Sequence, residues 1–490
     1  MTSTTPATKI NAILAIDVGT TNLKICIFSS DKCKLVCSRT EELVLITSKD
    51  DQLVEIEPDQ LWKQIFGMIE SLIAEADKLD LNILSIGLSC HRNSFFGAGP
   101  QLKTLEPCHK IITWKDKRAQ HYCEKWNNSY RRKFLNLFGL IASSFTHSER
   151  FKAARMFNLL DVMIAPRFLV ILQEDSKMQH LLSTNNLILT TLDCWILQKL
   201  TTNSDLFITE PSSISSTGLF DPFTLGDAQS AAFGSGCIQK GDVNLSLGTG
   251  AILDFVSGGE VHASMCGGVY PLIGWKLDEQ STTYLLESKF NHLISSLKWG
   301  NLINLIPSLA PTELNKLCEE LFNEEGEDLE DEDITCFIPF GLEKNGNDDC
   351  SSLFGIRSST NQKQIARSIF KSIIFGIYQI WTCLLTQLSL NDVKLIKRIR
   401  CCGGISLNNF ICQQICTLIN LPLERVEEPQ FCSAKGVALL AGIKQEFWTL
   451  NQIEDFIVPE RRFDPIQEQR TRLLQQYSYW VDIQKRFGKS

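Results

Sequence analysis

The sequence predicts an α/β protein made of two related domains. Its 490 residues would fill two to four domains of about 150 residues each. Short runs of strand character alternate with segments whose apolar residues recur at helical spacing. A unit of strand, Gly/Thr turn and strand occurs twice, about half a chain apart, at 12–28 and 243–256. We interpret this repetition as two domains of similar construction.

The first domain is expected to open with an antiparallel meander. The predicted strands are 12–16, 23–28, 35–37, 43–46 and 83–89. Between the predicted strands 43–46 and 83–89, the apolar residues recur at helical spacing from Glu57 onwards. The residues expected on the buried face of this helix are Leu61, Ile65, Ile69 and Ile73.

The second domain repeats this pattern. We expect strands at 243–247, 251–256 and around 397–402, and helices at 361–388, 408–419, 434–447 and 466–487. The resulting division is a tail at 1–10, a first domain at 11–225, a second domain at 226–450 and a helical extension at 451–490.

The composition is that of an ordinary folded protein. Hydrophobic residues make up 44% and charged residues 21%, and the net charge is −8. Much of the acidic surplus lies in Glu319–Asp333, which we expect to be a solvated loop or frayed helix, with a partner-docking segment as the alternative. Because no basic patch is evident, nucleic acid is not an expected partner.

Cysteine usage and hydropathy bear on location. The first residues lack the pattern of a secretory signal, so the 18 cysteines are expected to be reduced and the protein cytoplasmic. The uncharged segment 372–391 is long enough to span a bilayer, but it contains Gln379 and Gln387. We expect a buried helix there, and therefore no stable membrane anchor. The sequence leaves homo-oligomerisation open.

The turn after the first strand can bind phosphate. The motif DVGTTNLK places backbone N–H groups and hydroxyls at the end of a buried strand, where an anion can be held. Its candidate residues are Asp17, Thr20, Thr21, Asn22 and Lys24. Asp17 can hold a hydrated Mg²⁺ that bridges phosphate oxygens. A purely structural β-turn is the alternative.

Two further motifs extend this candidate nucleotide site. Thr249, between Gly248 and Gly250, would contact the same nucleotide from the second domain. Gly403 and Gly404 follow a predicted strand and precede a helix that opens at Asn408, and two glycines allow a planar ring such as adenine to approach closely. A plain strand-to-helix connection would explain them almost as well. The Rossmann and P-loop signatures are missing from the sequence.

In their order along the chain, these motifs resemble the FGGY family of carbohydrate kinases. DVGTTN is similar to the first phosphate motif, GDVNLSLGTGAILD to the second, and IRCCGGISLNNF with GVALLAG to the adenosine-binding region. The phrases ITWKDKRA, STGLFDP and GVYPLIGWK resemble the glycerol kinases of that family. The resemblance implies two actin-like ATPase (ribonuclease H-like) domains with a nucleotide cleft between them. It also implies transfer of a phosphoryl group from ATP, with Mg²⁺, to a small polyol such as glycerol.

The resemblance also implies roles for individual residues. Nucleotide contacts fall on Thr20, Thr21, Asn22, Lys24, Thr249, Gly404 and Asn408, and the Mg²⁺ position, through water, on Asp17. Substrate contacts fall on Arg92, Asn93, Trp114 and Asp227, and Asp227 in GDAQSAAFG is the implied general base. From the residues alone, Asp227 could equally cap a helix, Arg92 could form a salt bridge, and Trp114 could belong to the core.

The chain departs from the family pattern at several positions. Asn93 stands where a Glu is usual, Ala228 where a Gln is usual, and Ile294 where a Gly approaches the nucleotide. Only four residues separate Pro222 from Asp227, a reach of at most about 14 Å, which is too short for a crossover and a strand. We therefore expect a rebuilt cleft or a shortened form of the chain. The alternatives to a glycerol kinase are a pseudokinase that binds nucleotide or a protein partner, and a kinase for another sugar.

Overall fold

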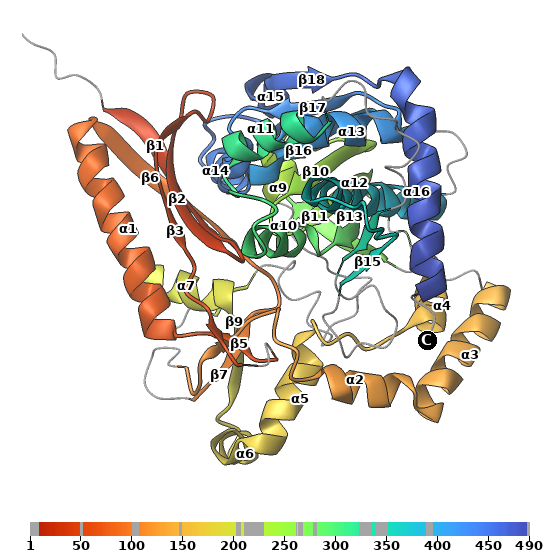
Figure 1. The fold of residues 1–490 in the computed structure, drawn as a ribbon. Coiled ribbons are helices and arrows are strands. Elements are labelled where there is room, and N and C mark those ends of the chain that lie inside the picture. Colours follow the sequence, from red (N-terminus) through yellow and green to blue (C-terminus); the bar gives the residue numbers. More distant parts are fainter. Residues whose placement is uncertain are drawn as a thin grey trace, which may run out of the picture.

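The computed structural model contains two α/β domains (Figure 1). It describes residues 9–49, 52–99, 107–146, 149–201, 207–209, 230–260, 262, 268–277, 282–322, 335–339, 351–388 and 395–487. The first domain lies at the left and below in Figure 1, and the second lies at the upper right.

A four-stranded sheet forms the body of the first domain. Its order is β3-β2-β1-β6, with β1 antiparallel to β2 and parallel to β6. The strands are β1 (Ile10–Val18), β2 (Asn22–Ser29), β3 (Leu35–Glu42) and β6 (Leu81–Cys90). Helix α1 (Pro58–Lys78) packs on one face of the sheet, and α7 (Leu192–Leu200) contacts β6.

The structure confirms most of the elements expected in this domain, with two corrections. Residues 43–46 are not one strand, because β3 ends at Glu42 and β4 (Ile46–Thr47) belongs to another sheet. Ile73 is 44% exposed and does not share the buried face of α1. Four residues of an α-helix turn about 40° more than one full turn. Over the three such steps from Leu61 to Ile73 the difference adds up to about 120° around the helix axis.

A second sheet and a group of helices, which we did not expect from the sequence, complete the first domain. The sheet order is β4-β5-β8-β7-β9, with β5 (Val54–Ile56), β7 (Phe95–Ala98), β8 (Ile111–Ile112) and β9 (Ile188–Thr191). The helices are α2 (Gln120–Asn127), α3 (Tyr130–Thr146), α4 (Glu149–Met156), α5 (Ile164–Glu174) and α6 (Ser176–Ser183).

A seven-stranded sheet of order β12-β13-β11-β10-β16-β17-β18 is the centre of the second domain. Its strands are β10 (Asp242–Leu247), β11 (Ala251–Gly258), β12 (Val269–Lys276), β13 (Thr282–Phe290), β16 (Arg398–Cys402), β17 (Leu423–Val426) and β18 (Pro459–Phe463). A separate hairpin pairs β14 (Cys336–Ile338) with β15 (Ser352–Phe354).

Helices cover both faces of this sheet. They are α9 (Ser230–Gly234), α10 (Leu293–Leu302), α11 (Pro311–Phe322), α12 (Gln362–Gln387), α13 (Asn409–Ile419), α14 (Cys432–Lys444), α15 (Leu450–Phe456) and α16 (Gln467–Phe487), with short 3₁₀ turns η3 (Gly404–Leu407) and η4 (Pro429–Phe431). Segment 451–490, treated above as an extension, supplies the edge strand β18 and buries Trp480 of α16 in the core of the second domain.

Helix α12 contains most of the uncharged segment noted in the sequence. Among the described residues, it is the one helix long and apolar enough to cross a membrane. Its apolar residues, including Ile369, Ile373 and Trp381, are buried in the core of the second domain. The structure therefore agrees with the expected core helix.

A hydrophobic cluster joins the two domains. Ile13 and Phe28 of the first sheet pack in one cluster with Phe233 of α9 and Leu439 of α14. Helix α14 contacts β1, β2 and β6 on the face of that sheet opposite to α1. The helix that carries GVALLAG, the second part of the adenosine-type motif, thus packs against the main sheet of the first domain.

Candidate functional site

The two Gly/Thr turns meet across the domain boundary. The Oγ1 atoms of Thr21 and Thr249 lie 3.0 Å apart, although 228 residues separate them in sequence. In the first turn Gly19 N donates to Asn22 O, and in the second Gly248 N donates to Gly250 O. Both turns connect adjacent antiparallel strands, β1 to β2 and β10 to β11. The structure thus brings together the two motifs proposed to hold phosphate.

Asp17 and Lys24 form a charged pair behind the first turn. Lys24 Nζ lies 3.9 Å from Asp17 Oδ2 and donates to the backbone oxygen of Gln430 at 2.7 Å. Burial raises the pKa of Asp17, and the charge of Lys24 and a hydrogen bond from Ser89 partly offset this effect. Lys24 therefore links the phosphate-type turn of the first domain to η4 of the second.

The Gly403–Asn408 segment lies beside the second turn. Gly403 has φ of +91°, and a side chain there would overlap the backbone of Leu247. A Cβ added to Gly404 would meet no atom within 4 Å, so the backbone is open on this side. Asn408 is buried, its Oδ1 accepts from Ile411 N at 2.9 Å, and it caps α13. The structure thus accounts for Asn408 as a helix cap.

The residues of the two turns fit a nucleotide with a hydrated divalent cation. The open space at Gly404 suits a flat ring, and the paired Thr hydroxyls suit phosphate oxygens. A buried carboxylate such as Asp17, whose ionisation burial disfavours, gains from a nearby cation. Lys24 supplies a further positive charge next to the first turn.

Arg92 reaches across the domains to a buried carboxylate. Its Nη2 donates to Glu287 Oε2 at 2.6 Å, and Lys289 Nζ lies 2.6 Å from Glu287 Oε1. Burial raises the pKa of Glu287, but Arg92 and Lys289 more than offset this and bring it below its ordinary range. In the structure, Arg92 therefore forms a salt bridge, which was the alternative to a substrate contact. This bridge connects the two domains.

Asp254 lies directly opposite Glu287 in the sheet and adds a second buried carboxyl group. It is 1% exposed, and its Oδ1 has no hydrogen-bond partner among the described residues. Burial and the neighbouring Glu287 raise its pKa well above the ordinary value, while Arg92 partly offsets this. Of the two carboxyl groups, Asp254 is therefore the one held closer to its protonated form.

These carboxyl groups belong to a polar row that crosses the whole sheet of the second domain. Successive cross-strand partners from β12 to β18 are Tyr270, Glu287, Asp254, Asn244, Arg400, Glu424 and Arg462. Paired residues point to the same face of a sheet. The other face, with residues such as Leu245 and Phe255, packs on the apolar core.

Trp114 connects the predicted substrate residues to the first turn. Its Nε1 donates to Thr20 Oγ1 at 3.1 Å, and its backbone N donates to Ser94 Oγ at 3.3 Å. Ser94 Oγ is also 2.7 Å from Nδ1 of His91. Burial, with a contribution from Lys115, lowers the pKa of His91 to about 4, so this imidazole is neutral at pH 7. Trp114 is half-buried, and the structure assigns it a hydrogen bond as well as packing.

Arg167 of α5 holds the two segments that carry these residues. Its Nη2 donates to Asn93 O at 2.7 Å, and its Nη1 donates to Thr113 O. Burial lowers the pKa of Arg167 to about 10, so it remains charged at neutral pH. Asn93 has φ of +58°, a left-handed conformation that Asn adopts more readily than most residues. Arg167 thus positions residues 92–93 and 113–114 relative to each other.

The expectations for the domain connection, the acidic run and Ile294 have different outcomes. Asp227, Ala228 and the short connection before them lie outside the described residues, as does most of the acidic run. Ile294 donates its backbone N–H to Thr249 O at 3.1 Å, and its side chain packs against the core of the second domain. The backbone of Ile294 therefore adjoins the second turn, while its side chain takes part in the packing of the second domain.

Sequence reasoning missed Glu287, Asp254, Lys289 and Arg167. A usable signal was present, since Asp254 and Glu287 each interrupt an apolar run, in AILDFV and YLLESKF. A charge in a buried strand needs a partner. The identity of that partner was not readable, because Arg92 is 195 residues from Glu287.

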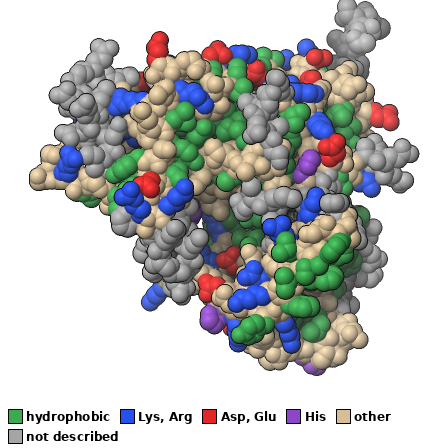
Figure 2. Space-filling view, turned by 90° about the vertical axis from the view of Figure 1, so that its right-hand side faces the viewer, with side chains coloured by type: hydrophobic (Ala, Val, Ile, Leu, Met, Phe, Trp, Pro, Cys, Tyr) green, Lys and Arg blue, Asp and Glu red, His purple; other side chains and the backbone are tan. Residues whose placement is uncertain are grey.

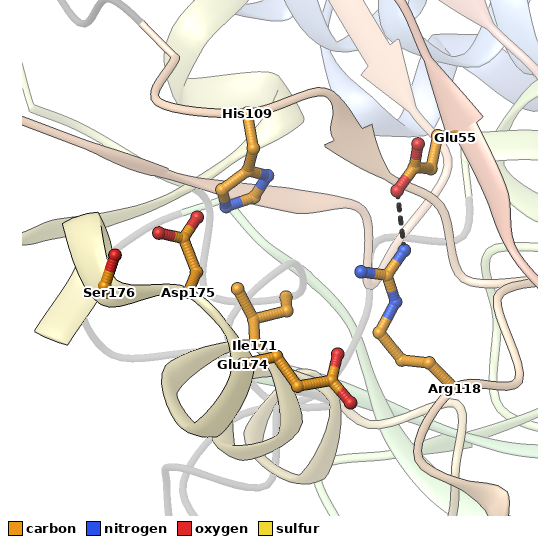
Figure 3. A pocket seen from close by; sticks show the side chains of 7 residues that line it. All are labelled: Glu55, His109, Arg118, Ile171, Glu174, Asp175 and Ser176. Carbon is orange, nitrogen blue, oxygen red and sulfur yellow. Dashed lines mark hydrogen bonds and ion pairs between the residues drawn. The ribbon is translucent and has the colours of Figure 1, made fainter.

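The surface between the upper and lower parts of the molecule is hollowed (Figure 2). A distinct cavity of about 370 Å³ lies within the first domain (Figure 3). Its lining residues are Glu55, His109, Arg118, Ile171, Glu174, Asp175 and Ser176. Arg118 donates to Glu55 Oε1 at 2.7 Å and to Asp116, so its charge is already neutralised. None of the residues predicted for the site lines this cavity.

Comparison with known proteins gives consistent matches along the chain. Residues 12–151 match the N-terminal domain, and residues 244–444 the C-terminal domain, of the FGGY family of carbohydrate kinases. The chain is 29% identical to glycerol kinase 5 of Homo sapiens, over 92% of each chain.

Solved structures show the same fold. Glycerol kinase of Plasmodium falciparum with ADP has a TM-score of 0.74 and 19% identity, over 97% of this chain and 98% of that one. Gluconate kinase of Lactobacillus acidophilus has a TM-score of 0.73 and 16% identity, over 98% and 99%. These likenesses confirm the two-domain fold class predicted from the sequence.

Proposed function

Because this chain belongs to the FGGY family of carbohydrate kinases, we propose that it transfers the γ-phosphoryl group of ATP to a hydroxyl of a small polyol, with glycerol as the leading substrate. The observation that carries the proposal is the meeting of Thr21 and Thr249, at 3.0 Å, beside the Asp17–Lys24 pair. Two hydroxyl-bearing turns, one from each domain, are suited to bind the triphosphate of a nucleotide.

The nucleotide would be held by residues of both domains. Thr20, Thr21 and Asn22 would face the phosphates from the first turn, and Thr249 from the second. The base would occupy the open space at Gly404. Asp17 would hold a hydrated Mg²⁺, which, when bound, offsets the negative charge of the phosphates.

The acceptor hydroxyl would be oriented by residues around the Arg92 loop. Trp114 offers an apolar ring for the carbon skeleton, and Arg167 fixes the loop that carries Arg92 and Asn93. Asp227, placed by family resemblance, would accept the hydroxyl proton as the new ester bond forms. Domain closure through the Arg92–Glu287 bridge would exclude water from the transfer.

The test is ADP release by purified protein with glycerol and with a panel of pentoses, hexoses and sugar acids. We expect release above the ATP-only background with glycerol, and Asp227→Asn should reduce it by at least about a hundredfold while ATP binding persists. Asp31→Asn, an exposed turn residue in the first domain, is the matched control and should leave the rate unchanged. Turnover retained in Asp227→Asn would mean that another group is the base.

Two alternatives are favoured by specific residues. Asn93 in place of the usual Glu removes an acceptor for substrate hydroxyls, which favours a different sugar, and turnover with another member of the panel would identify it. The short connection before Asp227 favours a pseudokinase. Calorimetric binding of Mg-ATP with no turnover on any substrate would support this alternative and contradict the kinase proposal.

A further inference from the structure

Helices α3 and α4 form a hairpin that projects from the first domain, at the lower right of Figure 1. The two helices pack closely through Gly139 of α3, where a Cβ would overlap the backbone of Ala154 and Arg155 in α4. Gly139 and Ser143 are the buried residues of α3. One face of α3 is therefore used in packing against α4.

The opposite face of α3 is apolar and exposed. Its exposed fractions are Tyr130 89%, Phe134 71%, Leu137 53%, Phe138 50%, Ile141 51% and Phe145 83%. At about 100° per residue, these six side chains fall within an arc of about 100°, and Gly139 and Ser143 lie on the other side. A helix of a globular protein normally turns such an apolar stripe toward the core. Here all six side chains stay at least half exposed, although Phe138, at one edge of the stripe, also contacts the ring of Phe151 in α4, with 5.8 Å between the ring centroids.

The hairpin that carries this apolar stripe has a net positive charge. Residues 130–157 contain six Arg or Lys and one Glu, a net charge of +5 in a chain whose net charge is −8. Arg131 and Lys133 are both exposed and lie near the two edges of the apolar arc. Figure 2, which views this side, shows hydrophobic side chains together with Lys and Arg over the lower part of the molecule.

We propose that the exposed face of α3 binds the surface of a membrane that contains anionic lipids. An amphipathic helix with aromatic residues on its apolar face and basic residues at its edges has the composition of an interfacial helix. The aromatic and aliphatic side chains would enter the boundary between headgroups and acyl chains. Arg131 and Lys133 would contact the lipid phosphates. Such binding is peripheral and requires no helix that spans the bilayer.

Shape and charge favour a lipid surface over a second copy of the chain. A projecting hairpin can approach a flat surface, whereas a two-fold contact through α3 would place the same basic segment of each copy against the other. Net charges of like sign at a self-complementary interface oppose association, whereas an anionic surface attracts this segment.

The test is flotation of the full chain with vesicles of phosphatidylcholine alone and of phosphatidylcholine with phosphatidylserine. We expect binding to the anionic vesicles that weakens with added salt, and little binding to the neutral ones. The variant Tyr130→Ser/Phe134→Ser/Phe145→Ser removes the three most exposed rings of α3, and Arg131→Glu/Lys133→Glu reverses the flanking charge. Each should lower the partition coefficient by about tenfold or more.

The control is Leu302→Ser, which removes an equally exposed side chain, 79% accessible, from α10 of the second domain. It should bind vesicles as the wild type does, and all variants should keep the wild-type melting temperature and ATP affinity. Absence of binding, or equal binding by the α3 variants, would overturn the proposal. If the α3 variants instead dissociate a dimer in sedimentation while vesicle binding stays unchanged, the face is a contact between copies and the proposal is wrong.

Discussion

Asp254 and Glu287 are neighbouring buried carboxyl groups whose pKa values shift in opposite directions. Burial and Glu287 raise the pKa of Asp254 in the folded protein. The stability that its protonated form contributes is therefore fully present below pH 3.8, the ordinary pKa of an Asp carboxyl group, and is lost as the pH rises through the raised pKa of the folded protein. Asp254→Asn keeps the shape without the ionisation. We expect the melting temperature of this variant to exceed that of the wild type by about 2 °C or more near pH 7, and the difference to shrink toward pH 4.

Glu287→Gln is the matched comparison, because it neutralises the adjacent carboxyl group. The stability linked to ionised Glu287 is present above pH 4.5 and is lost as pH falls, so this variant should be destabilised at pH 7, by about 3 to 5 kcal/mol. Arg92 and Lys289 would lose the negative charge that they share. Thermal melts of both variants from pH 4 to pH 8 check the pair. Equal effects of the two substitutions would contradict the opposite shifts.

At the scale of elements, helices α9 and α14 touch through their glycines. A Cβ at Gly436 of α14 would overlap the backbone oxygen of Ser230, and a Cβ at Gly234 of α9 would overlap that of Cys432. We expect Gly436→Ala to destabilise the protein by about 1 to 3 kcal/mol and to reduce ADP release, because it pushes apart α9, which follows Asp227, and α14. Thermal melting and the kinase assay measure the two effects.

Gly67→Ala in α1 is the control for that substitution. Gly67 is an exposed position inside a helix, and a Cβ there would meet no atom within 4 Å. Alanine should therefore stabilise the chain by up to about 1 kcal/mol. If Gly436→Ala melts at the wild-type temperature, the helices can separate without cost and the close contact is unimportant.

The elements also show what sequence can and cannot predict. The strands around 12–28 and 243–256 and helices α12, α13 and α16 followed from their hydrophobic period, because each has one strongly apolar face or run. Helices α2 to α6 did not. Helices α2, α4 and α6 have only eight residues each, and α3, with 17 residues, buries only Gly139 and Ser143. Lys24, Thr21 and Thr249 could be nominated as site residues from their motifs. The Arg92–Glu287 bridge depends on how the two domains dock, which no local pattern encodes.

At the scale of the whole molecule, the two domains share a hydrophobic cluster and should unfold together. Leu439 of α14 is fully buried in the cluster that also contains Ile13 and Phe28 of the first sheet. We expect Leu439→Ala to cost about 2 to 5 kcal/mol and to lower hydrogen-exchange protection in both domains at once. Exchange measured by mass spectrometry on peptides from β2 and β10 reports each domain separately.

Leu302→Ala, at an exposed position, should leave both peptides unchanged. Loss of protection in β10 alone would show that the domains unfold independently, and that α14 rests on the first sheet without stabilising it.

The polar row across the seven-stranded sheet also constrains how the chain folds. Side chains alternate between the two faces of a strand, so a slip of one residue in any pairing would move Asp254, Glu287 or Arg400 into the apolar core. Burial of an unpaired charge costs several kcal/mol. The correct alignment of the strands is therefore distinguished from its nearest misalignments by a large energy gap, whether or not a ligand is bound.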